Sequence, residues 1–192
     1  MKNLVKIICL SLIFSGAAMA QVKPYIAGEY NSEENRNTKV DNFGLNSIIG
    51  FKTSEGMDYS LKSGITQPTE GVTKDISYNL EVRAKKTFDL GFSVKPYLGV
   101  RLGEKLTKSE NFMHYAVDAG FLMPIAPSTT LDLGYRYRNN TGSDTKFDSN
   151  RYHIKTTYSL NANNAVSIWY LQAYGATAEE KNTWRLTYTY TF

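Results

Sequence analysis

Cysteine, histidine and long apolar runs are scarce in this sequence of 192 residues, and each scarcity excludes a class of protein. The single cysteine, Cys9, lies near the start, so the rest of the chain can form no disulfide and no cysteine metal site. No later stretch approaches the roughly 20 apolar residues of a transmembrane helix. Glycine-rich phosphate loops, metal-ligand clusters and nucleic-acid motifs are also missing. We therefore expect no cofactor, no metal and no nucleic-acid partner.

The N-terminal segment has the pattern of a secretory signal peptide. Positive residues come first, an apolar stretch follows from Ile7 to Phe14, and Ala18 and Ala20 supply the small residues of a cleavage site. The apolar stretch is too short to span a bilayer. We therefore expect residues 1–20 to be removed, with cleavage before Gln21.

Apolar and polar residues alternate at every second position through most of the remaining chain. This alternation predicts β-strands that have one apolar and one polar face. It is clear in Ile76–Lys85 and in the closing run, where the alternate residues are Trp184, Leu186, Tyr188, Tyr190 and Phe192. The ten segments are Val22–Glu29, Phe43–Lys52, Met57–Ile65, Ile76–Lys85, Val94–Leu102, Met113–Met123, Leu131–Tyr137, Tyr152–Leu160, Ala165–Tyr174 and Trp184–Phe192. The ninth is apolar on both faces, so its phase stays unassigned.

The links between these segments alternate in length. Four are short turns rich in Gly, Pro, Asn and Asp, and the five between them are longer and polar. Bacterial membrane barrels have short periplasmic turns and longer extracellular loops. The sequence therefore predicts an all-β fold: one transmembrane antiparallel up-and-down barrel over 21–192, with ten strands and both termini periplasmic. Eight strands is the alternative if the first or ninth segment is miscounted, and a soluble β-sandwich is the main structural alternative.

The polar face of the predicted strands should point into the barrel, and it is strongly basic. The predicted inward residues include eleven basic residues and at most five acidic ones. The basic residues are Lys52, Lys62, Arg83, Lys85, Lys95, Arg101, Arg136, Arg138, Arg151, Lys155 and Arg185, with His153 on the same face. The acidic residues are Asp58, Glu81, Asp118 and Asp132, with Glu29 as the fifth candidate.

This basic interior has two main interpretations. In the first, the side chains pair with one another and fill a barrel of structural or surface-interaction function. In the second, the cations line a narrow porin-like channel for small anionic solutes. The alternation Tyr135–Arg138 is similar to the arginine tracks of acidic-oligosaccharide channels, which have more strands.

An enzyme of the outer membrane, a protease or a lipid A-modifying barrel, is a third interpretation. It would need a histidine beside a carboxylate. The two histidines, His114 and His153, lie on the sixth and eighth segments without an Asp-x-His or His-x-Ser pair. We therefore predict no catalytic residues and no enzymatic activity.

The run Trp184–Phe192 resembles the C-terminal assembly signal of bacterial outer-membrane barrels, in which a terminal Phe follows aromatic residues at alternate positions. Over 21–192 the chain resembles the small outer-membrane β-barrel proteins, the group of OmpA-like domains and opacity-type surface antigens. Leu131–Tyr137 looks like a penultimate-hairpin strand of that group, although three more strands follow it here. The resemblance implies a bacterial outer-membrane location and recognition by the insertion machinery. It also implies a monomer in contact with lipid and lipopolysaccharide, with loops open to host or phage ligands.

Overall fold

A computed structural model of the chain describes residues 22–36, 41–69, 76–108, 111–141, 148–175 and 180–192. The predicted signal peptide, with its cleavage site at Ala18, Ala20 and Gln21, lies outside the described residues. Ten β-strands make up the fold: β1 Val22–Asn35, β2 Asp41–Thr53, β3 Met57–Pro68, β4 Ser77–Thr87, β5 Lys95–Leu106, β6 Asn111–Ala126, β7 Thr129–Asn140, β8 Ser149–Ser159, β9 Asn164–Gly175 and β10 Glu180–Thr191. No helix in these ranges is long and apolar enough to cross a membrane.

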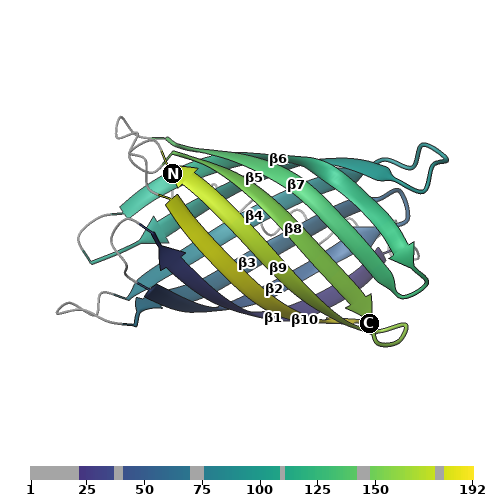
Figure 1. Cartoon of the computed structure of the whole chain (residues 1–192), viewed down its shortest axis with the longest axis horizontal. Helices are drawn as coiled ribbons and strands as arrows, with labels where there is room; N and C mark the ends of the chain where they lie inside the picture. Colours follow the sequence, from purple (N-terminus) through teal and green to yellow (C-terminus); the bar gives the residue numbers. More distant parts are fainter. Residues whose placement is uncertain (1–21, 37–40, 70–75, 109–110, 142–147, 176–179) are drawn as a thin grey trace.

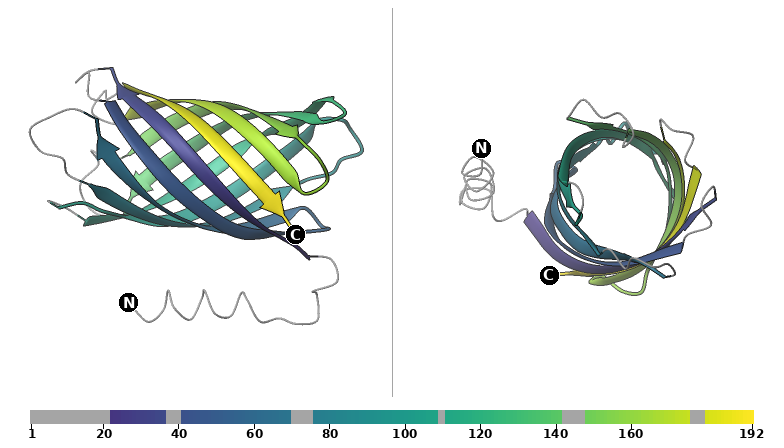
Figure 2. Two further views of the ribbon diagram at one scale, coloured as in Figure 1. Left: turned by 90° about the horizontal axis from the view of Figure 1, so that it is seen from below. Right: turned by 90° about the vertical axis from the view of Figure 1, so that its left-hand side faces the viewer.

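The ten strands close into one antiparallel barrel (Figure 1). Each strand pairs with the next along the chain, and β10 returns to pair with β1, so that the view along the barrel shows a ring (Figure 2). In the closing pair Tyr25 lies opposite Thr191, and the Phe192 N–H donates to the Pro24 carbonyl at 3.0 Å. The predicted ten-strand barrel is confirmed. The eight-strand alternative is wrong, because the first and ninth segments are both strands.

The strands are longer than the alternation predicted, and the links are correspondingly shorter. β1 continues to Asn35, because polar residues beyond the alternating segment still pair with both neighbouring strands. We call one end of the barrel the turn end, defined by links 54–56, 88–94, 127–128 and 160–163, and the opposite end the loop end. β1 begins and β10 ends at the turn end. The two ends differ less than predicted, since link 88–94 is longer than link 107–110 at the loop end.

The outward face of the barrel is apolar around the ring. Aliphatic side chains such as Ile49, Leu98 and Ile168 are each 55 % exposed. Exposed aromatic residues gather toward the loop end (Tyr78, Tyr115, Tyr137, Tyr152, Trp184) and toward the turn end (Phe121, Tyr158, Tyr190, Phe192). Water-soluble proteins rarely leave so much contiguous apolar surface uncovered. Two aromatic bands around an aliphatic belt are the arrangement expected of a barrel in a bilayer.

Candidate functional site in the charged lumen

The inward face carries ion pairs that join neighbouring strands. On β6, Asp118 accepts hydrogen bonds from Arg101 Nε at 2.5 Å and from Arg136 Nε at 2.6 Å. Arg101 Nη1 also donates to Glu81 at 2.5 Å, while His114 Nε2 lies 3.7 Å from the same carboxylate. These residues, Glu81, Arg101, Asp118 and Arg136, form the central network. Asp118 is only 2 % exposed, so its charge depends on the two arginines rather than on water.

A second group of ion pairs surrounds Glu29 on β1. Lys62 Nζ donates to Glu29 Oε1 at 2.6 Å, and Arg185 Nη1 lies 3.7 Å from that oxygen. Asn46 Nδ2 donates to Glu29 at 3.1 Å. Glu29 is 4 % exposed. One carboxylate therefore joins strands β1, β2, β3 and β10 across the closing seam of the barrel.

A tyrosine–aspartate contact occurs twice in the lumen, at corresponding places in the two halves of the chain. Tyr25 on β1 donates to Asp58 at 2.8 Å, and Arg83 Nη2 donates to the same carboxylate at 2.8 Å. Tyr97 on β5 donates to Asp132 at 2.8 Å. Each tyrosine follows a Lys-Pro pair in the sequence and reaches two strands onward.

The second copy of this contact also holds His153. Its Nε2 lies 3.2 Å from the Tyr97 hydroxyl and 3.2 Å from Asp132 Oδ1. All three side chains are buried. A carboxylate thus lies beside each histidine, Asp132 beside His153 and Glu81 beside His114, although neither pair is adjacent in sequence. Among the described residues, no group of three or more His, Cys, Asp and Glu side chains could hold a metal ion.

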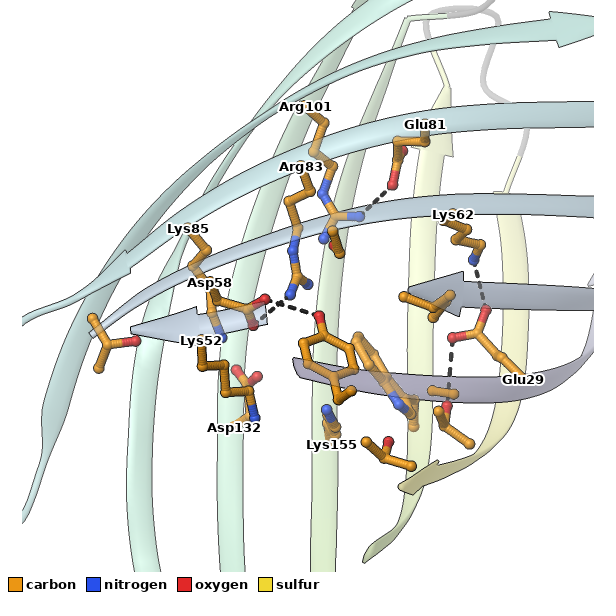
Figure 3. Close-up of a pocket in the computed structure, with 18 of the residues that line it drawn as sticks. Glu29, Lys52, Asp58, Lys62, Glu81, Arg83, Lys85, Arg101, Asp132 and Lys155 are labelled. Atoms are coloured by element: carbon orange, nitrogen blue, oxygen red, sulfur yellow. Dashed lines mark hydrogen bonds and ion pairs between the residues drawn. The ribbon is translucent and has the colours of Figure 1, made fainter. Parts of the chain in front are cut away.

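A cavity of about 300 Å³ lies inside the barrel and reaches the turn end, where Thr53, Gly56 and Thr87 line it (Figure 3). Its lining has twice as many cations as carboxylates. The charged lining residues are Lys52, Lys62, Arg83, Lys85, Arg101, Arg136, Lys155 and Arg185, with Glu29, Asp58, Glu81 and Asp132. The central network and the Glu29 group thus border the side of the cavity that is farther from the turns.

Three cavity lysines lie over aromatic rings. The ammonium group of Lys52 is 5.4 Å from the ring centroid of Tyr25, that of Lys85 is 4.8 Å from Tyr97, and that of Lys155 is 4.3 Å from Trp169. Aromatic faces attract cations at such distances. The rings therefore hold the lysines in place without neutralising them.

The remaining predicted basic residues lie away from the cavity. Arg138 and Arg151 belong to the loop end of β7 and β8, near the ion pair of Lys181 with Glu33 at 3.4 Å. Lys95 lies at the turn end and pairs with Asp89 at 2.5 Å. The hydrogen bond from Lys95 is the main reason that the pKa of Asp89 lies below its usual value.

The structure brings most of the predicted lumen residues together. Eight of the eleven predicted inward basic residues line the cavity, namely Lys52, Lys62, Arg83, Lys85, Arg101, Arg136, Lys155 and Arg185. All five predicted inward acidic residues contact cationic or histidine side chains, namely Glu29, Asp58, Glu81, Asp118 and Asp132. Sequence reasoning missed the inward aromatic residues Tyr25, Tyr97 and Trp169. The repeated Lys-Pro-Tyr could have signalled the tyrosines, whereas nothing in β9 marks Trp169.

The closed antiparallel barrel, with its apolar exterior and charged lumen, has the fold of the small outer-membrane β-barrel proteins. An outer membrane channel from Pseudomonas putida F1 is similar, with a TM-score of 0.57 and 8 % identity over 90 % of this chain and 95 % of that one. The β domain of the Bordetella autotransporter BrkA has a TM-score of 0.54 and 11 % identity, over 90 % of this chain and 100 % of that one. The NanC porin has a TM-score of 0.53 and 8 % identity, over 85 % of this chain and 98 % of that one. No protein-family model and no curated protein matches the sequence.

Proposed function

We propose that this protein is an integral barrel of the bacterial outer membrane, with a structural or surface-interaction role and a lumen closed by its own side chains. The observation that carries this proposal is the burial of Asp118 between Arg101 and Arg136. An open aqueous pore would leave such groups in contact with water. The outward apolar face supports membrane insertion, because only lipid would cover it on every side.

Burial on several other strands supports a closed lumen. Leu171 on β9 and Ala116 on β6 are 2 % exposed, and Thr187 on β10 is 5 % exposed. All three lie on the inward phase of their strands. Small barrels of about eight strands have interiors just wide enough for side chains to fill. A ten-strand barrel with long basic side chains fits the same description.

In the proposed orientation both ends of the barrel chain are periplasmic and the loop end faces outward. The loop end would then meet lipopolysaccharide and any host or phage ligand, and the outward row of β10 would be read by the insertion machinery. We propose a monomer, because the ring leaves no strand edge unpaired.

A narrow channel for small anionic solutes is the second candidate. The excess of cations around the cavity favours it, since lining charges set the selectivity of pores. Two structural neighbours are described as a channel and a porin, which supports this candidate only at the level of the fold.

Single-channel recordings in planar bilayers separate the two candidates. The wild-type barrel should give no conductance steps, while an open porin inserted in the same way gives them. A variant with alanine at Glu81, Arg101, Asp118 and Arg136 loses two charges of each sign and should begin to conduct if these side chains close the lumen. Its folding is checked by heat-modifiable gel migration. Anion-selective steps from the wild type would favour the channel instead.

We also propose that the protein is not an enzyme. His153 Nε2 is occupied by Tyr97 and Asp132, and His153 is not among the residues that line the cavity. A substrate would have to displace this buried contact. Peptide-cleavage and lipid A-modification assays should show no turnover, and an activity that His153→Ala abolishes would contradict this proposal.

A further inference from the structure

The three ring-stacked lysines of the cavity lack anionic partners. Within the described part of the chain, none of Lys52, Lys85 and Lys155 forms an ion pair with a carboxylate. They come from three different strands, β2, β4 and β8, and point into the same cavity (Figure 3). Lys155 is attracted by Asp132 and Lys85 by Asp58, both beyond ion-pair distance, while Lys155 is repelled by Lys52 and Lys85. Gathering like charges in a confined space is unfavourable unless an anion or water compensates them.

The four carboxylates of the lining compensate these lysines only in part. Three of them already hold another cation, and Asp132 is left to attract Lys85 and Lys155. Glu29 holds Lys62, Asp58 holds Arg83 and Glu81 holds Arg101. Asp132 accepts from Tyr97 and contacts His153. The lysines therefore remain a positive surplus after the internal ion pairs are formed.

Unused hydrogen-bond donors lie around the same space. Among the described residues that line the cavity, the Nε atoms of Arg83 and Arg185 and Nε1 of Trp169 are buried without a partner. Buried donors are normally satisfied, so each such atom calls for an acceptor. A ligand with several oxygens would neutralise the lysines, and a small movement of the side chains that cover these nitrogen atoms would let it accept from them as well.

We propose that this cavity is a binding site for a small multivalent oxyanion of the phosphate type, entering from the turn end. The cavity volume of about 300 Å³ is about ten times that of a water molecule in the liquid, which suits an ion of pyrophosphate size. The lysines provide charge and the arginine and tryptophan donors provide direction. Binding does not require a conducting pore. If the barrel has the proposed orientation, the turn end and the entrance of the cavity face the periplasm; the rest of the proposal does not depend on that orientation.

Titration of the folded, detergent-solubilised barrel with inorganic pyrophosphate tests this site. Trp169 lies in the cavity whereas Trp184 is 57 % exposed on the outside, and these are the only two tryptophans. In a Trp184→Phe background the fluorescence of Trp169 therefore reports on the cavity. We expect a saturable change with pyrophosphate, a weaker response to phosphate and none to chloride at matched ionic strength.

Two neighbouring lysines on β4 provide matched variants. Lys85 points into the cavity, while Lys86 is on the outward phase and donates to the Glu55 carbonyl at 2.6 Å. Lys85→Gln should weaken pyrophosphate binding about tenfold or more, and Lys86→Gln should leave it within about twofold, as calorimetry would measure. Absence of saturable binding, or equal losses in both variants, would overturn the site. Either result would leave the conductance test of the closed lumen unaffected.

Discussion

At the scale of single residues, the lumen is organised by carboxylates that each hold more than one donor. Asp118 joins β5, β6 and β7 through two arginines, and Glu29 joins β10 to β3 across the seam. A buried ion pair is weak evidence of stability by itself, because desolvation offsets much of the attraction. Removal of one partner is different, since the remaining charge stays buried and unpaired.

Asp118→Asn should therefore destabilise the folded barrel by about 3–5 kcal/mol. Asparagine has nearly the same shape but no charge, so Arg136 would lose the carboxylate that its Nε contacts. The measurement is the midpoint of denaturant unfolding of the barrel in lipid vesicles. Asp89→Asn is the control: it also removes a carboxylate from an ion pair, but its partner Lys95 stays in contact with water at the turn end. Equal midpoints for the two variants would contradict the importance of the central network.

Two inward glycines make room for Tyr97. A methyl group on Gly134 would collide with the Tyr97 hydroxyl and the His153 ring, and one on Gly120 would meet the same tyrosine. Gly134→Ala should cost about 1–3 kcal/mol through overpacking, read from the same unfolding curves. Gly28→Ala is the matched control, since Gly28 lies in a strand with nothing within 4 Å of its added methyl group. A smaller loss for Gly134→Ala in a Tyr97→Phe background would identify the hydroxyl as the obstacle.

At the scale of strands, alternation predicted the elements well where one face is apolar and the other polar. Ile76–Lys85 became β4, Ser77–Thr87, with nearly the same bounds. β1 runs past its predicted end, because alternation reports faces and not backbone pairing. The phase of β9 could not be assigned from the sequence, because apolar residues lie on both of its faces: Leu171 faces the lumen and Ile168 faces outward. Apolar residues fill the lumen beside β9, so the sequence of this strand does not alternate between apolar and polar residues.

The candidate site was predictable in its charge but not in its contacts. Strand phase alone places Arg136 and Asp132 inside, because side chains alternate across a sheet. The partners are set by barrel closure and by side-chain length. Tyr97, for example, reaches across β6 to Asp132 on β7. A rule that sends aromatic residues outward fails at Tyr25 and Tyr97, where the hydroxyl has a buried acceptor.

The outward residues of β10 and the following Phe192 allow a test of the predicted assembly signal. Phe192 is 64 % exposed and its N–H pairs with Pro24, while Phe92 in the turn 88–94 is 71 % exposed. If β10 is read during insertion, Phe192→Ala should lower the amount of heat-modifiable protein in the outer membrane several-fold. Phe92→Ala removes a comparable exposed ring at the same end and should have little effect. Similar losses in both variants would indicate a general requirement for apolar surface rather than a signal.

At the scale of the whole molecule, the barrel separates two environments. The backbone is satisfied by a ladder that closes on itself, the outer face is apolar, and the charges inside are largely paired with one another. This inversion of the soluble pattern, with polar residues inside, is stable only where lipid surrounds the ring. The cavity, whose lining has more cations than carboxylates, reaches the turn end of the barrel. The side of the membrane that this end faces therefore decides which compartment reaches the cavity.

Thiol labelling determines that side. If signal cleavage removes Cys9 as predicted, a cysteine introduced elsewhere is the only thiol in the mature chain. Thr141 at the loop end and Ser93 in the turn 88–94 are both exposed, small and polar. A maleimide polymer too large for porins should label Thr141→Cys on intact cells and Ser93→Cys only after the outer membrane is permeabilised. The reverse pattern would place the loop end in the periplasm and open the cavity to the outside of the cell.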